Sequence, residues 1–358
     1  MSKSDFHKSF KLEGRSFDTS KSLIDFCEKR HPQIVDFLRN WYDEKMFMIV
    51  KTSGSTGVPK NIELRKSHMV NSARATGDFL QLSSGISALL CLPTAYIAGK
   101  MMMIRALVLG WELDIVSPDL RPLNSLKKNY DFAAMVPLQL AHSIKDLYRL
   151  KILIVGGAPI DAKLLEEINQ LPTLIYETYG MTETITHIAL KKLNTKAVNA
   201  EQLSNAFELL PNVKIQQKGG KLIIDAPKIS DAIIETNDLV RLDSPNSFVW
   251  LGRADSVINT GGIKVFPEQI EQKIGILISD RFFVFARPDT QLGSRLILIL
   301  EKEELMDEEA ENLLFQIREL TSISRYECPK EIWSIPTFLE TPTGKLNRPA
   351  TFEKLKLG

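Results

Sequence analysis

The sequence predicts an α/β protein with a large layered α/β domain, a β-rich part within it, and a small α+β domain at the C-terminus. Three observations predict this. Between residues 47 and 190, short apolar runs alternate with helical patterns, as in a layered sheet. Between 207 and 251, strand-like runs follow one another with turn residues between them. Beyond residue 253, helices and strands form a compact unit of about 100 residues, an ordinary domain size.

The first 46 residues are expected to form a small opening lobe. It is expected to contain a hairpin and two helices, over 10–17, 23–29 and 34–41. Glu13-Gly14 marks the hairpin turn. Pro32 separates the two helices, because proline removes a backbone donor and clashes within a helix.

The layered domain follows this lobe. Its expected strands are 47–50, 88–92, 112–116, 132–136, 152–155 and 173–176. Ser67 can cap a helix that runs to about residue 80, and 98–109 has a helical pattern. In the β-rich part the expected turns are Pro211-Asn212, Gly219-Gly220 and Pro245-Asn246.

The last part of the chain predicts a separate α+β unit, so we expect two domains, 1–252 and 254–358. The smaller one is expected to contain helices 267–274 and 308–320, and strands 282–286, 296–300 and 332–335. The chain is then expected to end on a polar loop at 341–348.

Composition excludes several classes of protein. The chain has 358 residues, of which 44% are hydrophobic and 25% charged, which excludes a disordered or fibrous protein. The net charge is +1, so no overall field attracts nucleic acid or an anionic membrane. Residues 1–11 do not resemble a signal peptide, and 98–111 is too short and too charged to cross a bilayer. Three scattered cysteines predict reduced thiols, so we expect a cytoplasmic protein without membrane insertion.

The strongest local pattern is a Ser/Gly-rich loop after the first strand of the layered domain. Glycines let backbone N–H groups point into one concavity, hydroxyls add donors, and a lysine adds charge, which together suit phosphate. The loop does not match the phosphate-binding pattern of a P-loop kinase, because no glycine precedes Lys60 and no Ser or Thr follows it. The loop residues concerned are Thr52, Ser53, Gly54, Ser55, Thr56, Gly57 and Lys60.

Further motifs follow this loop in a fixed order. They are 176–184 (YETYGMTET), 236–239 (TNDL), 251–255 (LGRAD), 259–264 (NTGGIK) with 267–271, and 343–345 (TGK). This ordered set resembles the adenylate-forming superfamily of acyl-CoA synthetases, luciferases and peptide-synthetase adenylation domains. Within it, the compact length and the region 92–101 look most like o-succinylbenzoate–CoA ligases of menaquinone biosynthesis. Members usually carry a longer segment before the Ser/Gly loop than this chain has.

The resemblance implies an ATP site that also binds Mg²⁺. The Ser/Gly loop would hold the β- and γ-phosphates. Tyr179 would stack on adenine, Asp238 would accept hydrogen bonds from both ribose hydroxyls, and Arg253 would contact the ribose. Thr182 would donate to the α-phosphate, and Glu183 would coordinate Mg²⁺. Gly156, Gly157, Ala158 and Gly180 would complete the adenine slot.

The resemblance also implies roles in the two steps of ligation. Lys345 would offset the repulsion between the acid carboxylate and the α-phosphate. Gly261, Gly262 and Lys264 would face CoA in the second step. Asp255 would be the hinge about which the small domain rotates between the steps.

The acid pocket is expected along the region after residue 92, with His187 at its side. Its expected residues are Tyr96, Gly99, Lys100, Arg105 and His187. Many relatives have His at the position of Tyr96, so the role of that position does not transfer. Lys100 and Arg105 are five residues apart and lie on different faces of a helix, so only one is expected to meet the second carboxylate of o-succinylbenzoate.

Together these patterns predict an ATP- and Mg²⁺-dependent acid–CoA ligase whose partners are a small-molecule acid, ATP and CoA. The nearest alternative is an adenylating ligase for another aryl or acyl acid, with CoA or a carrier protein as acceptor. A nucleotide-binding regulator on the same fold and a P-loop kinase are less consistent with the motifs. The sequence leaves a homodimer open.

Overall fold

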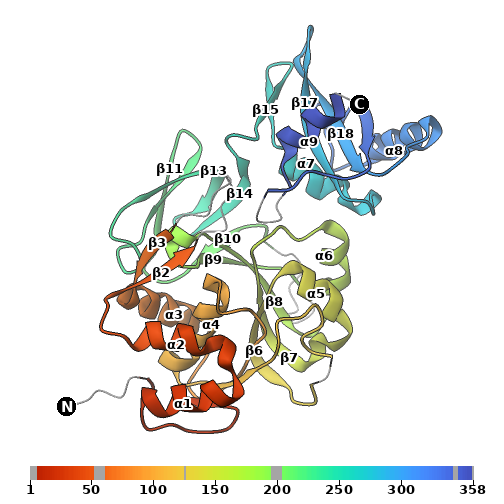
Figure 1. Cartoon of the computed structure of the whole chain (residues 1–358). Helices are drawn as coiled ribbons and strands as arrows, with labels where there is room; N and C mark the ends of the chain where they lie inside the picture. Colours follow the sequence, from red (N-terminus) through yellow and green to blue (C-terminus); the bar gives the residue numbers. More distant parts are fainter. Residues whose placement is uncertain (1–5, 52–60, 125, 195–203, 342–345, 357–358) are drawn as a thin grey trace.

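The computed structural model describes residues 6–51, 61–124, 126–194, 204–341 and 346–356. Its main feature is a twelve-stranded sheet with the strand order β1-β5-β4-β6-β7-β8-β9-β10-β14-β13-β12-β11. Figure 1 shows this large part, with a smaller part beyond Arg253 standing at one end of it.

One half of the large sheet is parallel. Its strands are β1 (Lys11–Leu12), β5 (Glu112–Ile115), β4 (Ser87–Leu90), β6 (Tyr130–Met135), β7 (Leu150–Val155) and β8 (Leu174–Gly180). Parallel strands need helices on both faces, and such strands are apolar on both sides. This explains why the sequence shows continuous apolar runs here rather than alternation with polar residues.

Helices cover both faces of this parallel half, so it forms the middle of three layers. On one face lie α1 (Ser20–Arg30), α2 (Val35–Tyr42), α3 (Lys66–Leu80) and α4 (Ile97–Leu109). On the other lie α5 (Pro137–Ser143), the turn η2 (Ile144–Arg149) and α6 (Ala162–Asn169). In β6, Phe132 packs into the first layer and Ala133 into the second. The predicted layered α/β domain is confirmed.

The other half of the large sheet is antiparallel. It consists of β9 (His187–Lys192), β10 (Phe207–Leu209), β14 (Ser247–Arg253), β13 (Ile234–Ser244), β12 (Lys221–Asp225) and β11 (Lys214–Lys218). The sequence predicted this β-rich part but not its attachment. β9 pairs antiparallel with β8 and β10 with β9, so the two halves share one sheet.

Two expectations for the first part of the chain need correction. Strand β2 (Phe47–Lys51) does not join the large sheet, but pairs with β3 (Asn61–Arg65) in a separate two-stranded sheet. The sharp turn at Glu13-Gly14 is present, but β1 pairs mainly with β5 and not within a hairpin. Strand pairing depends on partners far along the chain, which local patterns do not reveal.

The smaller part has its own sheets and helices. They are the hairpin β15 (Ile258–Thr260) and β16 (Ile263–Val265), the sheet β17 (Phe282–Asp289), β18 (Gly293–Glu301) and β19 (Glu331–Ile335), and the helices α7 (Pro267–Ile274), α8 (Asp307–Glu319) and α9 (Arg348–Lys356). The sequence missed α9, because its few apolar residues show no clear period. Its Phe352 is buried against Phe285 and Trp333.

The large sheet ends at Arg253, where the predicted boundary between 1–252 and 254–358 lies. The two parts touch: the side chain of Gln269 on α7 donates to the carbonyl of Trp250 on β14 at 3.2 Å. That each part folds as an independent domain stays a prediction. Among the described residues, none of the helices is both long and apolar enough to cross a membrane.

Candidate active site

The carboxyl ends of the parallel strands meet at one edge of the large sheet, where ligands bind in open α/β sheets. Gly156 follows β7, and Tyr179 and Gly180 end β8. A Cβ atom on Gly156 would lie 2.0 Å from Thr178 Oγ1, and one on Gly180 would lie 2.2 Å from the carbonyl oxygen of Thr186. Packing between neighbouring strand ends therefore requires glycine at both positions.

A tyrosine, two carboxylates and an arginine meet beside this edge. The hydroxyl of Tyr179 donates to Asp238 Oδ2 at 2.6 Å, and Asp238 lies opposite Arg253 in the pairing of β13 with β14. Arg253 Nη1 is 3.8 Å from Asp238 Oδ1. The same guanidinium donates to both oxygens of Asp255 at 3.2 Å. The pairing of β13 with β14 thus brings Asp238 and Arg253 together, and Asp255 follows two residues later.

This group carries one positive and two negative charges, with the arginine between the two carboxylates. Burial, followed by the charge of Asp238, raises the pKa of Tyr179, so the phenol stays protonated and remains a donor. The hydrogen bond from Arg253 lowers the pKa of Asp255. Asp238 is 8% exposed, and a carboxylate has further acceptor positions beyond the one that Tyr179 occupies. It can therefore still accept from a ligand hydroxyl. Asp255 is in an ion pair, and its role as a hinge stays a prediction.

Thr182 and Glu183 lie in the short turn η3 (Thr182–Thr184), directly after β8. The Glu183 side chain is exposed and forms no ion pair with any described residue. A carboxylate in this position fits Mg²⁺, which is held in proteins by one or two carboxylates together with substrate phosphates. The described residues contain no cluster of three or more His, Cys, Asp or Glu that could hold a metal ion.

A second polar group lies in the interior, between α3, α4 and β9. Arg105 on α4 is 1% exposed, and its Nε donates to Thr76 Oγ1 at 3.3 Å. Its Nη2 has no hydrogen-bond partner, and no carboxylate among the described residues pairs with it. Burial lowers the pKa of Arg105 to about 9, so the guanidinium is still charged at neutral pH. A buried charge without a counterion is costly to the folded protein.

His187, at the start of β9, completes this interior group. Its Nε2 lies 3.1 Å from Thr76 Oγ1, whose own proton has the carbonyl of Ser72 within reach at 3.1 Å. If the proton of Thr76 goes to Ser72, the hydroxyl oxygen accepts from a protonated Nε2 of the ring. Burial, reinforced by the charge of Arg105, lowers the pKa of His187 well below its usual value. The imidazole is neutral and does not share the positive charge.

The interior group borders a small pocket. His187 and Ser72 line it together with Asn212 and Lys228, and its volume is about 160 Å³. Ser72 Oγ is buried and has no hydrogen-bond partner among the described residues. Pockets for whole drug-sized ligands are larger, about 300 Å³ or more, so this one fits only one end of a ligand.

The other predicted acid-pocket residues take structural positions. Lys100 Nζ donates to the carbonyls of Thr94 and Ala95 at 2.5 and 3.2 Å, and burial lowers its pKa. A Cβ atom on Gly99 would lie 2.3 Å from the carbonyl oxygen of Pro93, so only glycine fits there. Tyr96 is 64% exposed at the N-cap of α4. Lys100 and Arg105 thus lie on different sides of the helix, as their spacing predicted.

The remaining predicted site residues fall into two groups. Gly261 and Gly262 form the turn between β15 and β16 with φ of +57° and +80°, and Lys264 is exposed on β16. The Ser/Gly loop (Thr52 to Lys60) and Lys345 lie outside the described residues.

Sequence reasoning missed Thr76 and Ser72, which belong to no motif. A signal was present, because Met69, Ala73, Thr76 and Leu80 form the buried stripe of α3, and a polar residue in such a stripe needs a partner. The sequence could not show that the partner would be His187, 111 residues away.

Comparison with known proteins places the chain in a family. The family model for AMP-binding enzymes matches residues 35–216, a little over half of the chain. The chain therefore belongs to the AMP-binding enzyme family. A solved acyl-CoA synthetase (AMP-forming)/AMP-acid ligase II-like protein from Dyadobacter fermentans is 36% identical, with a TM-score of 0.61, over 94% of this chain and 99% of that one.

Two further proteins are similar to this chain. The 2-succinylbenzoate–CoA ligase of Haemophilus influenzae is 26% identical over 81% of this chain but only 66% of its own length. This chain thus spans about two thirds of that relative. The fold also matches the o-succinylbenzoate coenzyme A synthetase of Bacillus subtilis, solved with ATP and magnesium ion, with 19% identity, a TM-score of 0.71, and coverage of 93% of this chain and 82% of that one.

Proposed function

We propose that this protein is an ATP- and Mg²⁺-dependent ligase that activates a carboxylic acid as its acyl-adenylate and passes the acyl group to CoA. The observation that carries the proposal is the meeting of Tyr179, Asp238 and Arg253 beside the carboxyl end of β8. In a member of the AMP-binding family, a fixed ring with an adjacent carboxylate suits an adenine and its ribose.

The first step joins acid and nucleotide. An oxygen of the acid carboxylate attacks the α-phosphorus of ATP, and the bond to pyrophosphate breaks. Thr182 would donate to the α-phosphate, and Glu183 would hold the Mg²⁺ whose charge offsets that of the phosphates. Lys345 would contact both anions and stabilise the charge of the transition state.

The second step uses the thiol of CoA. Its sulfur attacks the acyl carbonyl, the carbonyl–phosphate bond breaks, and AMP leaves. The small part would rotate about Asp255 between the steps, so that Gly261, Gly262 and Lys264 replace Lys345 beside the reaction.

For the acid, we propose an aryl dicarboxylate of the o-succinylbenzoate type. Arg105 supports this, because a buried guanidinium with an unpartnered Nη2 is suited to a second carboxylate. The hydroxyl of Ser72 also lacks a partner within the described residues and would add a donor. Lys100 is a weaker candidate, since its ammonium already donates to two backbone carbonyls.

Two half-reactions test this proposal: pyrophosphate release from ATP and o-succinylbenzoate, and conversion of supplied acyl-AMP and CoA to thioester. We expect Lys345→Ala to slow the first by about 100-fold or more and to spare the second. Asp255→Pro should do the opposite, because the proline ring fixes φ at the hinge. Neither half-reaction occurring in the wild-type protein with any of a panel of acids would refute the proposed function. ADP as a product would indicate a kinase instead.

A further inference from the structure

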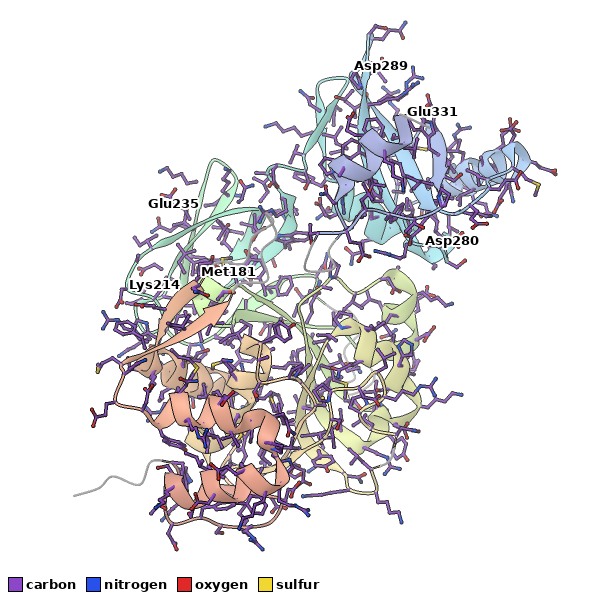
Figure 2. All side chains as sticks on the ribbon, viewed as in Figure 1. Met181, Lys214, Glu235, Asp280, Asp289 and Glu331 are labelled. Carbon is purple, nitrogen blue, oxygen red and sulfur yellow. The ribbon has the colours of Figure 1, made fainter. Side chains whose placement is uncertain are left out.

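The connection between β8 and β9 contains a strained turn. Residues 181–186 join the two strands, with Thr182 and Glu183 near the start and His187 immediately after. Ile185 has φ +67° and ψ −60°, and the N–H of Thr186 donates to the carbonyl of Thr184 at 2.7 Å. This is a γ-turn with positive φ, which is rare and strained, and a β-branched residue makes it more costly. Figure 2 labels Met181, the first residue of this connection, at the upper left of the large part.

Such strain persists only where the surroundings enforce it. Ile185 is 1% exposed within the main hydrophobic core, which holds its side chain. Thr184 is fully buried, and its Oγ1 accepts from the N–H of Met181 at 3.0 Å. Its one proton has two carbonyl oxygens within reach, that of Thr186 at 2.7 Å and that of Met181 at 3.0 Å, and the shorter distance is to Thr186. One hydroxyl therefore contacts the backbone at both the first and the last residue of the connection, Met181 and Thr186.

We propose that Thr184 is a positioning residue that fixes the Glu183 carboxylate and the His187 imidazole relative to each other. Glu183 lies between the two segments that the hydroxyl ties together, and His187 follows Thr186 directly. The nucleotide end and the acid end of the site would then move as one unit. This inference rests on the proposed function, because it assigns Glu183 to Mg·ATP and His187 to the acid.

A tight turn by itself does not require this arrangement. Glycine adopts positive φ without strain, so a connection that served only to reverse the chain would have no need for isoleucine at its strained position. The packed Ile185 side chain and the bonded Thr184 hydroxyl instead exclude alternative conformations of the connection. A fixed conformation matters where two ligands must meet, because small errors in position lower the rate of a two-substrate reaction.

The test compares three substitutions. Thr184→Val keeps the shape but removes the hydroxyl, Thr184→Ser keeps the hydroxyl, and Thr173→Val removes a buried hydroxyl at the other end of β8, where Thr173 donates to the carbonyl of Leu147 at 2.6 Å. Calorimetric titration with Mg·ATP gives the affinity, pyrophosphate release gives the KM for o-succinylbenzoate, and thermal unfolding gives the stability. We expect Thr184→Val to weaken Mg·ATP binding about tenfold and to raise the KM for the acid. Thr184→Ser and Thr173→Val should leave both near wild-type values.

A double-mutant cycle separates positioning from a general loss of stability. If Thr184 acts through Glu183, then Thr184→Val should have little further effect on Mg·ATP affinity in a Glu183→Gln protein. Additive effects would overturn the inference. It would also be overturned if Thr184→Val lowered the Tm as Thr173→Val does and left affinity and KM unchanged. A wild-type protein that binds no Mg·ATP would instead overturn the proposed function, and the inference with it.

Discussion

The two polar groups of the candidate site differ in how completely their charges are matched. In the group of Tyr179, Asp238, Arg253 and Asp255, the arginine faces two carboxylates and its side chain is 41% exposed. In the interior group, Arg105 is 1% exposed and has no carboxylate partner among the described residues. Under the proposed function, the first group would bind the nucleotide that every turnover uses. Under the same proposed function, the buried charge of the second group would be matched by an anionic part of the acid, and this group would then select the substrate.

The largest expected effect concerns the group of Tyr179, Asp238, Arg253 and Asp255. Asp238→Asn should weaken ATP binding by about 100-fold, because the amide replaces a charged acceptor with one that also presents donors. Asp243→Asn is the matched control, since Asp243 lies on the same strand and pairs only at the surface with Arg241, at 3.8 Å. Calorimetric titration with ATP measures both. Equal affinities in the two variants would place the ribose elsewhere.

A smaller but more selective effect is expected in the interior group. Arg105→Met should raise the KM for o-succinylbenzoate about 10- to 100-fold and have much less effect on the KM for monocarboxylic benzoates. Lys100→Met is the control and should not change this selectivity. The Arg105→Met protein without ligand should unfold at the same or a higher temperature, because it loses an unmatched buried charge. A loss of several degrees would show that the charge is matched within the folded chain.

The smallest expected effect is on the dependence of stability on pH. The folded-state pKa of His187 is lowered, so below about pH 6.5 the unfolded chain binds a proton that the folded chain does not. Stability is then fully present above that pH and is lost as the pH falls, by about 1 kcal/mol per pH unit for this group. His187→Gln should therefore flatten the stability curve between pH 5 and 6.5 relative to wild type.

Asp255 provides the contrast for this measurement. Its pKa is also lowered, by the hydrogen bond from Arg253, but the unfolded carboxyl titrates only near pH 4. Its contribution is lost as the pH falls through and below that value. Asp255→Asn should accordingly leave the difference between pH 5 and 6.5 unchanged. A flattening in Asp255→Asn, or none in His187→Gln, would contradict the assignment of the two groups.

Much of the fold and part of the site could be read from local patterns. The runs at 132–136 and 152–155 mark buried parallel strands, because such strands are apolar on both faces. The glycines at 156 and 180 mark strand ends where another segment passes too closely for a side chain. The order of the motifs led to the AMP-binding family. These signals are local in the chain, since each depends on residue types at short spacing.

What the sequence by itself determined, then, is the layered α/β class, most of the helices and strands, and the residues that belong to family motifs. Only the tertiary structure decided the pairing of β8 with β9, which joins the two halves of the sheet, and the meeting of Arg105, Thr76 and His187. The physical reason is distance along the chain. A hydrogen bond such as that between Thr76 and His187 spans 111 residues and forms only when the packing of α3 and α4 on the sheet brings its partners together. The charge on Arg105 was visible in the sequence, but its burial, with no counterion in the described part of the chain, was not.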